Sequence, residues 1–197
     1  KTGSNLWIDH TLGYLVPYEL YYEEHPEYFA LVNGKRVYTT PKGHRRGIHH
    51  QAVACLSNPN VTRIAAERMI AWMDNCPEQR FFCCTYGDSS THCECEDCRK
   101  LDVMPAEHTD RVLHWVNGVA REVRKKHPDK VLILWAYLDT QAAPRRVKPE
   151  PNVIVCFSPW SGLMTSCRLH PMSLCHRSIA GARHMEEWLK RAPNNLA

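Results

Sequence analysis

Residues 80–98 (RFFCCTYGDSSTHCECEDC) constrain the fold of this chain more than any other segment. Residues 81–86 form a continuous apolar run that ends at Gly87, a pattern typical of a buried strand in a sheet covered on both faces. Asp88 follows directly, at the expected carboxyl end of that strand. In α/β folds, the loops after the carboxyl ends of parallel strands build the functional site. We therefore expect Asp88 to lie in a functional site.

The rest of the chain alternates between helical and strand-like patterns. Apolar runs predict buried strands at 6–8, 131–137 and 153–157, and helical periodicity predicts helices over 59–75, 110–127 and 178–191. Asn33-Gly34 supplies the two positive-φ positions of a tight hairpin turn within 28–37. Because consecutive buried strands are joined through helices, we expect a parallel sheet with right-handed crossovers.

This order of elements predicts an α/β fold, a parallel (β/α) barrel of the TIM type. An eight-stranded barrel takes roughly 250 residues, and the chain has 197. We therefore expect residues 1–197 to be the central part of such a barrel domain, or an open sheet if the chain is complete. Because the chain begins without methionine, we expect it to be a piece of a longer polypeptide with additional domains.

Composition excludes two classes of partner. The net charge of +4 is spread along the chain rather than gathered in a basic patch, so no nucleic-acid partner is expected. The longest apolar runs fall far short of the roughly 18 residues that a membrane span needs.

Three of the ten cysteines form a tight cluster, Cys93-x-Cys95-x-x-Cys98. Zn²⁺ takes four ligands at tetrahedral angles, and so short a loop could present three thiolates to a structural zinc ion. The fourth ligand would be Cys84, His92 or a distant cysteine. Free thiols or a disulfide are the alternative, and no other cofactor is expected.

Several short segments of the sequence together resemble one family, the proteins with domain of unknown function 4838. The segments are His10, HPEYFAL at 25–31, NGKR at 33–36, CLSNP at 55–59, Asp88 before the cysteine cluster, and VNGVA at 116–120. That family is bacterial, often multidomain, and similar to glycoside hydrolases with (β/α)8 barrels, in particular α-glucuronidases and β-hexosaminidases. The resemblance covers roughly residues 5 to 192.

The resemblance implies a glycoside hydrolase that acts on a carbohydrate substrate, with an acidic or an N-acetylated sugar as candidates. Such an enzyme would be secreted or periplasmic. The alternative is a non-catalytic glycan-binding or scaffold module with a structural zinc loop, because fold does not dictate function.

Three residues are catalytic candidates, since glycosidases need carboxyl groups at the scissile bond. Asp88 could act as acid, nucleophile or base, or it could merely cap a Gly-Asp-Ser-Ser turn. Asp139, just past the strand that ends at Tyr137, is the best second carboxylate in this chain. His10 follows a predicted strand end and could donate a proton, bind sugar, or be a satisfied structural histidine.

Substrate-binding candidates are aromatic or basic. Sugar rings stack on aromatic faces, so the rings at or near strand ends could form a subsite: Tyr86, Trp135, Tyr137 and Trp160. The alternative for these four is ordinary core packing, which we favour for Trp135. Arg36, Arg45 and Arg46 could clamp a sugar carboxylate, although a solvated basic loop is the favoured interpretation.

Overall fold

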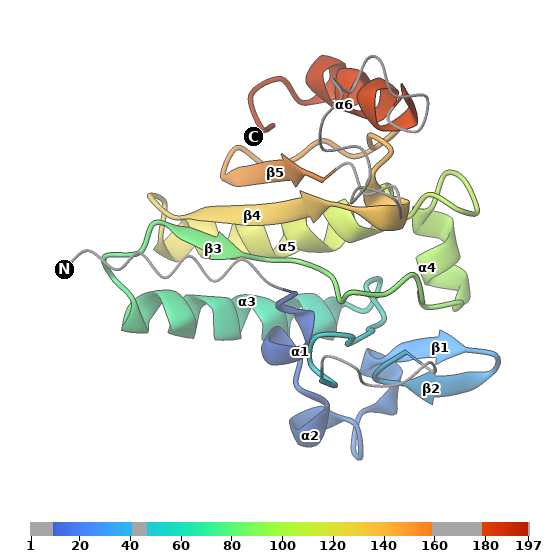
Figure 1. Cartoon of the computed structure of the whole chain (residues 1–197). Coiled ribbons are helices and arrows are strands. Elements are labelled where there is room, and N and C mark those ends of the chain that lie inside the picture. The colour runs from blue at the N-terminus through green and yellow to red at the C-terminus, as the bar shows by residue number, and fades with distance from the viewer. Residues whose placement is uncertain (1–9, 41–46, 159–178, 197) are drawn as a thin grey trace.

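The computed structural model of the chain describes residues 10–40, 47–158 and 179–196 (Figure 1). At its centre is a parallel sheet of β3 (Phe81–Cys83), β4 (Val131–Ala136) and β5 (Val153–Phe157), in that order. The middle strand is the longest and the most apolar, because it has a neighbour on each side. The predicted parallel arrangement of these strands is confirmed, whereas the strand expected at 6–8 lies outside the described residues.

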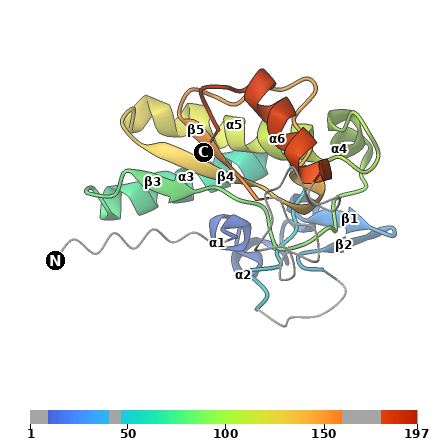
Figure 2. The same ribbon diagram turned by 45° about the horizontal axis from the view of Figure 1, so that its top comes forward.

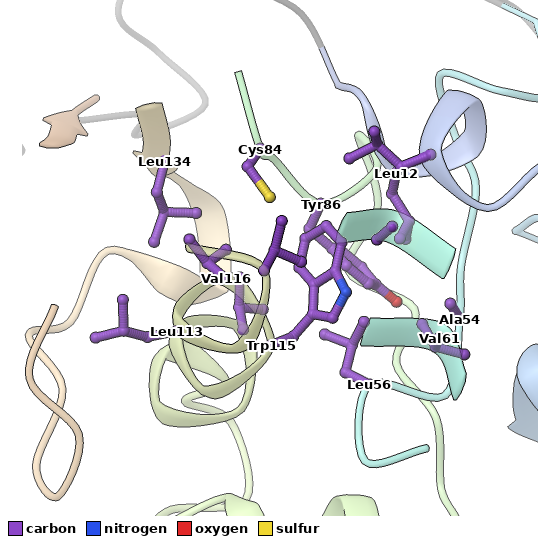
Figure 3. Packing of buried hydrophobic residues seen from close by; sticks show 14 of the residues in the cluster. Leu12, Ala54, Leu56, Val61, Cys84, Tyr86, Leu113, Trp115, Val116 and Leu134 are labelled. Atoms are coloured by element: carbon purple, nitrogen blue, oxygen red, sulfur yellow. The ribbon is translucent and has the colours of Figure 1, made fainter. Parts of the chain in front are cut away.

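Two long helices, α3 (Pro59–Asn75) and α5 (Thr109–Lys126), pack against one another beside the sheet (Figure 1). The side chain of Asn58 caps α3 by accepting a hydrogen bond of 3.0 Å from the Asn60 amide. Trp115 and Leu113 of α5 project into the core, among residues that include Leu56, Tyr86 and Leu134 (Figure 3). This apolar face therefore anchors α5 to the sheet and to the segment before α3.

A third helix, α6 (Ile179–Arg191), lies past the β5 edge of the sheet, whereas α3 lies past the β3 edge (Figure 1; Figure 2 gives the view turned by 45°). Its Trp188 is fully buried and donates a hydrogen bond of 2.9 Å to the Gln141 carbonyl. After the helix the chain returns to the edge of β5, where Leu196 forms a parallel bridge with Val155.

Smaller elements flank the sheet: α1 (Leu12–Leu15), α2 (Tyr18–Tyr21), η1 (Pro26–Tyr28), β1 (Ala30–Val32), β2 (Lys35–Val37), α4 (Glu96–Leu101) and η2 (Leu138–Thr140). β1 and β2 form the predicted antiparallel hairpin. Its turn has Asn33 at φ 49° and Gly34 at φ 75°, as a tight turn of this kind requires. None of the helices in the described part of the chain has both the length and the apolar character that a membrane crossing requires.

The prediction of a TIM-type barrel is wrong for the residues that the structure describes. They form an open three-stranded parallel sheet and a separate two-stranded antiparallel sheet, and no closed barrel is present among them. Closing a barrel requires enough tilted strands for the two edges of the sheet to meet. Moreover, residues 137–152 join β4 to β5 through the short turn η2 rather than through a full crossover helix.

β3 is also shorter than the apolar run that predicted it. The amide of Cys84 still donates to the Ile133 carbonyl at 2.8 Å, but the next residue turns away from β4. Thr85 and Thr11 exchange two hydrogen bonds in which each hydroxyl accepts from the other residue's amide, at 3.0 and 3.1 Å. The chain after β3 is therefore held by the segment before α1.

Candidate functional site

The carboxyl ends of β3 and β4 meet at one edge of the sheet, and each is followed by polar side chains. Asp88 lies five residues beyond the end of β3, whereas Tyr137 follows β4 directly. The Tyr137 hydroxyl donates a hydrogen bond of 2.7 Å to Oδ1 of Asp88. The loops after two neighbouring parallel strands are therefore joined by their side chains, in the part of an α/β fold where functional sites form.

Gly87 brings Asp88 close to the segment that precedes α3. A Cβ atom at Gly87 would lie 2.2 Å from the carbonyl oxygen of Ala52, so no other residue fits there without a backbone shift. Beside this contact, the Asp88 amide donates to the His50 carbonyl at 2.8 Å. The second carboxylate oxygen of Asp88, Oδ2, lies 3.9 Å from Nδ1 of His50.

His10 completes this group of polar side chains. Its Nδ1 lies 2.6 Å from the Tyr86 carbonyl oxygen, which can only accept, so Nδ1 carries the proton. The ring packs edge-on against His50 at 4.6 Å and lies 5.9 Å from the Tyr137 ring. Ligating atoms of His10, His50 and Asp88 all lie within 4.8 Å of one another. The structure thus brings His10 and Asp88 together and adds His50.

The turn after β4 positions both Tyr137 and Asp139. Leu138 between them adopts φ 52°, a left-handed conformation that costs a non-glycine residue roughly 1–2 kcal/mol. Thr140 holds the turn, because its hydroxyl accepts from the Tyr137 amide at 3.0 Å and donates to the Tyr137 carbonyl at 2.7 Å. Backbone strain of this kind is concentrated at functional sites.

A small hollow opens between the ends of the two strands. Its lining includes His10, Tyr86, Trp135, Tyr137 and Asp139, which are five of the candidates identified from the sequence. Its volume is about 20 Å³, which is room for about one water molecule. A sugar ring would therefore have to lie across the rim of this hollow.

Asp139 faces this hollow and is paired with a histidine. Its Oδ2 lies 2.8 Å from Nε2 of His92. The His92 ring is buried between the Tyr86 ring, stacked at 4.8 Å and 11°, and the His108 ring at 3.9 Å. Burial lowers the pKa of His92 below its ordinary value, although the contact with Asp139 acts in the opposite direction.

The three clustered cysteines meet a fourth, Cys55, from the segment before α3. The Cys55 sulfur lies 3.6 Å from that of Cys95 and 3.8 Å from that of Cys98, and all four Sγ atoms lie within 4.8 Å of one another. Zn–S bonds of about 2.3 Å at tetrahedral angles place neighbouring sulfurs about 3.8 Å apart. The four cysteines could therefore hold a metal ion.

The chemistry of the thiols also fits a cation. Contacts with Cys93 and Cys98 hold the pKa of Cys55 well below its ordinary value. The contact with Cys55 raises the pKa of Cys93 to about 11, and it also raises the pKa of Cys98. Four thiols packed this closely cannot all ionise unless a positive charge lies among them. No disulfide joins the eight cysteines that lie in the described residues.

The hairpin β1–β2 closes one side of the cysteine cluster. The Leu31 amide donates to the Cys93 sulfur at 3.2 Å, and Nη1 of Arg36 lies 4.0 Å from the same sulfur. A second hydrogen bond links the hairpin to the cysteine loop, because the Glu94 amide donates to the Leu31 carbonyl at 2.7 Å. A metal ion bound here would tie together the hairpin, the segment at Cys55 and the loop that leads into α4.

The chain matches the family model for the domain of unknown function DUF4838 over residues 1–194. The chain belongs to the DUF4838 family. No curated protein and no solved structure gives a significant match to it. Two of the sequence segments that carried the resemblance contribute residues to the two sites of this DUF4838 chain. Asp88 lies at the strand ends, and Cys55 belongs to the cysteine cluster.

The remaining candidates of this DUF4838 chain lie elsewhere. Arg36 serves the hairpin, because its Nη1 donates to the Phe29 carbonyl at 2.8 Å, rather than reaching the hollow at the strand ends. Trp160, Arg45 and Arg46 lie outside the described residues. Cys84, one candidate for the fourth metal ligand, is buried in the apolar core, where burial raises its pKa.

Sequence reasoning missed the roles of four residues: His50, Cys55, His108 and Arg111. His50 sits in a polar segment without periodicity, and Cys55 is 38 residues from its nearest partner, Cys93, so neither has a local signal. Arg111 lies among apolar residues of α5 and is buried, and an arginine in such a place needs a charged partner, which Asp102 supplies. Among these four residues, only Arg111 carried a signal in the sequence, because it is a charged residue on an otherwise apolar helix face.

Proposed function

We propose that this DUF4838 chain belongs to a carbohydrate-active enzyme that hydrolyses glycosidic bonds, with Asp88 as a catalytic carboxylate. The observation that carries this proposal is the hydrogen bond from Tyr137 to Asp88 at the shared edge of β3 and β4. It orients one carboxylate oxygen, while the other lies toward His50. A placed carboxylate is the one group that glycosidase mechanisms share.

The surroundings of Asp88 support this role. Asp139 is proposed as the second carboxylate, and His10 as a proton donor or a sugar ligand, since both line the hollow that Gly87 and Ser89, the two chain neighbours of Asp88, also line. The rings of Tyr86, Trp135 and Tyr137 line the same hollow and offer the apolar surface on which sugar faces stack. An acidic or N-acetylated sugar is the proposed substrate, in keeping with the enzymes that the sequence resembles.

The four-cysteine cluster is proposed to hold a structural zinc ion. Cys55, Cys93, Cys95 and Cys98 would supply the ligands, which leaves no open position for a water or a substrate. The ion would supply charge to four thiolates and a cross-link between segments far apart in the sequence. It would take no part in the hydrolysis.

One observation favours a second function, a non-catalytic glycan-binding module stabilised by the same zinc. The hollow at the strand ends has a volume of about 20 Å³, so it encloses little more than a water molecule. Aromatic rings at its rim could bind a sugar without any cleavage.

Replacing Asp88 by Asn separates the two functions. Hydrolysis of a panel of aryl glycosides would be measured for the complete protein, with Asp129→Asn as the matched control because the Asp129 side chain is 71% exposed. An Asp88→Asn variant that still binds the glycan but has lost turnover supports the enzyme. Undiminished turnover removes Asp88 from the mechanism, and glycan binding by a wild-type protein that cleaves no member of the panel supports the binding module.

A further inference from the structure

Three side chains that could bind a metal ion meet beside the strand-end site, and one of them, Asp139, also lines its hollow. They are His92 after β3, His108 at the start of α5 and Asp139 after β4. One ligand atom from each lies within 4.8 Å of the other two. Two imidazoles and a carboxylate from three separate segments form a donor set that divalent transition metals prefer.

His108 is oriented in the way that metal-binding histidines are. Its Nδ1 lies 3.0 Å from Oδ2 of Asp102, so Nδ1 carries the proton and Nε2 has the lone pair. Asp102 is fixed in turn by Arg111, whose Nε donates to Oδ1 at 3.1 Å and whose Nη2 donates to Oδ2. A carboxylate that holds the far nitrogen of a ligating histidine is the usual outer shell of such sites.

His92 carries a buried nitrogen that the rest of the protein does not satisfy. Its side chain is 5% exposed, and Nδ1 has no hydrogen-bond partner among the described residues. A buried polar atom without a partner costs roughly 1–3 kcal/mol. Nε2, the other ring nitrogen, faces Oδ2 of Asp139 at 2.8 Å, a spacing at which both atoms could bind one ion.

A large polar hollow gives access to His92 and His108. Its volume is about 480 Å³, and its lining includes Ser90, His92, Asp102, His108 and Arg111. Three protein ligands leave at least one coordination position, and a hollow of this size can supply water or a small ligand to it. This hollow is distinct from the one beside Asp88, which Asp139 lines from the other side.

We propose that His92, His108 and Asp139 bind a divalent metal ion, with Zn²⁺ or Co²⁺ as the matching class, at a site separate from the four cysteines. Two imidazoles at the tetrahedral angle on one ion, with bonds of about 2.1 Å, have ring centroids about 5.3 Å apart. The observed separation is 3.9 Å, so the two rings would part by roughly 1.4 Å when the ion binds. This inference does not depend on glycoside hydrolysis, but with the ion bound Asp139 is a ligand and Asp88 remains for proton transfer.

Metal content per chain tests the proposal. The purified protein would be dialysed against Zn²⁺ and then freed of excess, and bound zinc would be counted for the wild type, His108→Gln and Asp139→Asn. Each variant should lose one equivalent relative to the wild type, while His25→Gln, which alters a partly exposed histidine beside Glu27 that belongs to neither metal site, should lose none. Retention of the full wild-type content by both ligand variants overturns the proposal.

A second measurement guards against variants that fail to fold. Circular dichroism would confirm the fold of each variant, and Co²⁺ would replace Zn²⁺ as a coloured probe. Intense thiolate charge-transfer bands report the cysteine cluster, whereas weak ligand-field bands alone report a nitrogen and oxygen site. The Cys98→Ser variant should keep the weak bands, and the His108→Gln variant should lose them. Weak bands that survive His108→Gln in a folded protein overturn the proposal.

Discussion

The hydroxyl of Tyr137 donates a hydrogen bond of 2.7 Å to the carboxylate of Asp88, although 49 residues separate the two in the chain. The contact exists because β3 and β4 are parallel neighbours whose carboxyl ends lie at the same edge of the sheet. The first prediction concerns this hydrogen bond.

Replacing Tyr137 by Phe keeps the ring and removes only the hydroxyl. A hydrogen bond to a charged group contributes about 1.5–3 kcal/mol, so we expect kcat/KM on a cleaved glycoside to fall about tenfold or more. Steady-state kinetics at fixed pH would measure the loss, and Tyr14→Phe is the matched control because Tyr14 is exposed and does not line the hollow. Full activity in Tyr137→Phe would show that this contact does not serve the reaction.

Removing the metal from the four-cysteine cluster should destabilise the protein. A chelator is expected to lower the Tm of the wild type, since a structural zinc ion contributes its binding free energy to folding. Cys55→Ser should lower the Tm without a chelator and abolish the chelator's further effect on this cluster. Cys76→Ser is the control, because Cys76 lies outside the cluster. Equal chelator sensitivity in Cys55→Ser and the wild type would contradict a metal at this cluster.

Gly87→Ala should destabilise the fold more than Gly34→Ala does. The added Cβ at residue 87 would meet the Ala52 carbonyl oxygen at 2.2 Å, whereas at residue 34 it would meet nothing within 4 Å. Forced overpacking costs about 1–3 kcal/mol or more, while alanine at a positive φ costs roughly 1–2 kcal/mol. Urea unfolding of both variants would measure the two free energies, and a smaller loss for Gly87→Ala would refute the close approach of residues 87 and 52.

Arg111→Met should cost far more stability than Arg121→Met. Arg111 is buried, pairs with Asp102 and donates to the Cys93 carbonyl at 2.8 Å, so its loss leaves a buried carboxylate uncompensated. Breaking such a pair costs about 3–5 kcal/mol. Arg121 pairs with Glu150 at 3.1 Å on the surface, where ion pairs contribute about 0–1 kcal/mol. Denaturant titration would compare them, and equal losses would argue against the buried role of Arg111.

Local patterns in the sequence predicted the local structure well. The helix at Pro59–Asn75, the strand at Val153–Phe157 and the turn at Asn33-Gly34 all follow from the identity and spacing of neighbouring residues. Helical and strand periods, caps and turn residues act over a few positions, so they can be recognised without knowing what packs against them. The parallel pairing of β3 with β4 followed as well, because α5 joins these two strands and carries the chain back to the same end of the sheet.

The barrel was a wrong prediction because closure is not a local property. The number of strands, and whether the two edges of a sheet meet, depend on every element at once. The same limit applied to the candidate sites. Cys93, Cys95 and Cys98 could be grouped by spacing, but Cys55 joins them only because the segment before α3 folds against the loop before α4.

The amino-acid order alone thus indicated the main helices, strands and the hairpin turn, and it marked Asp88 and three of the four clustered cysteines. The folded chain decided which distant side chains touch: Tyr137 with Asp88, and His92 with Asp139. The physical reason is the distance along the chain over which each kind of interaction acts. Backbone preferences act between neighbours in the chain, whereas contacts across the sheet edge arise only after burial of the apolar core has brought separate segments together.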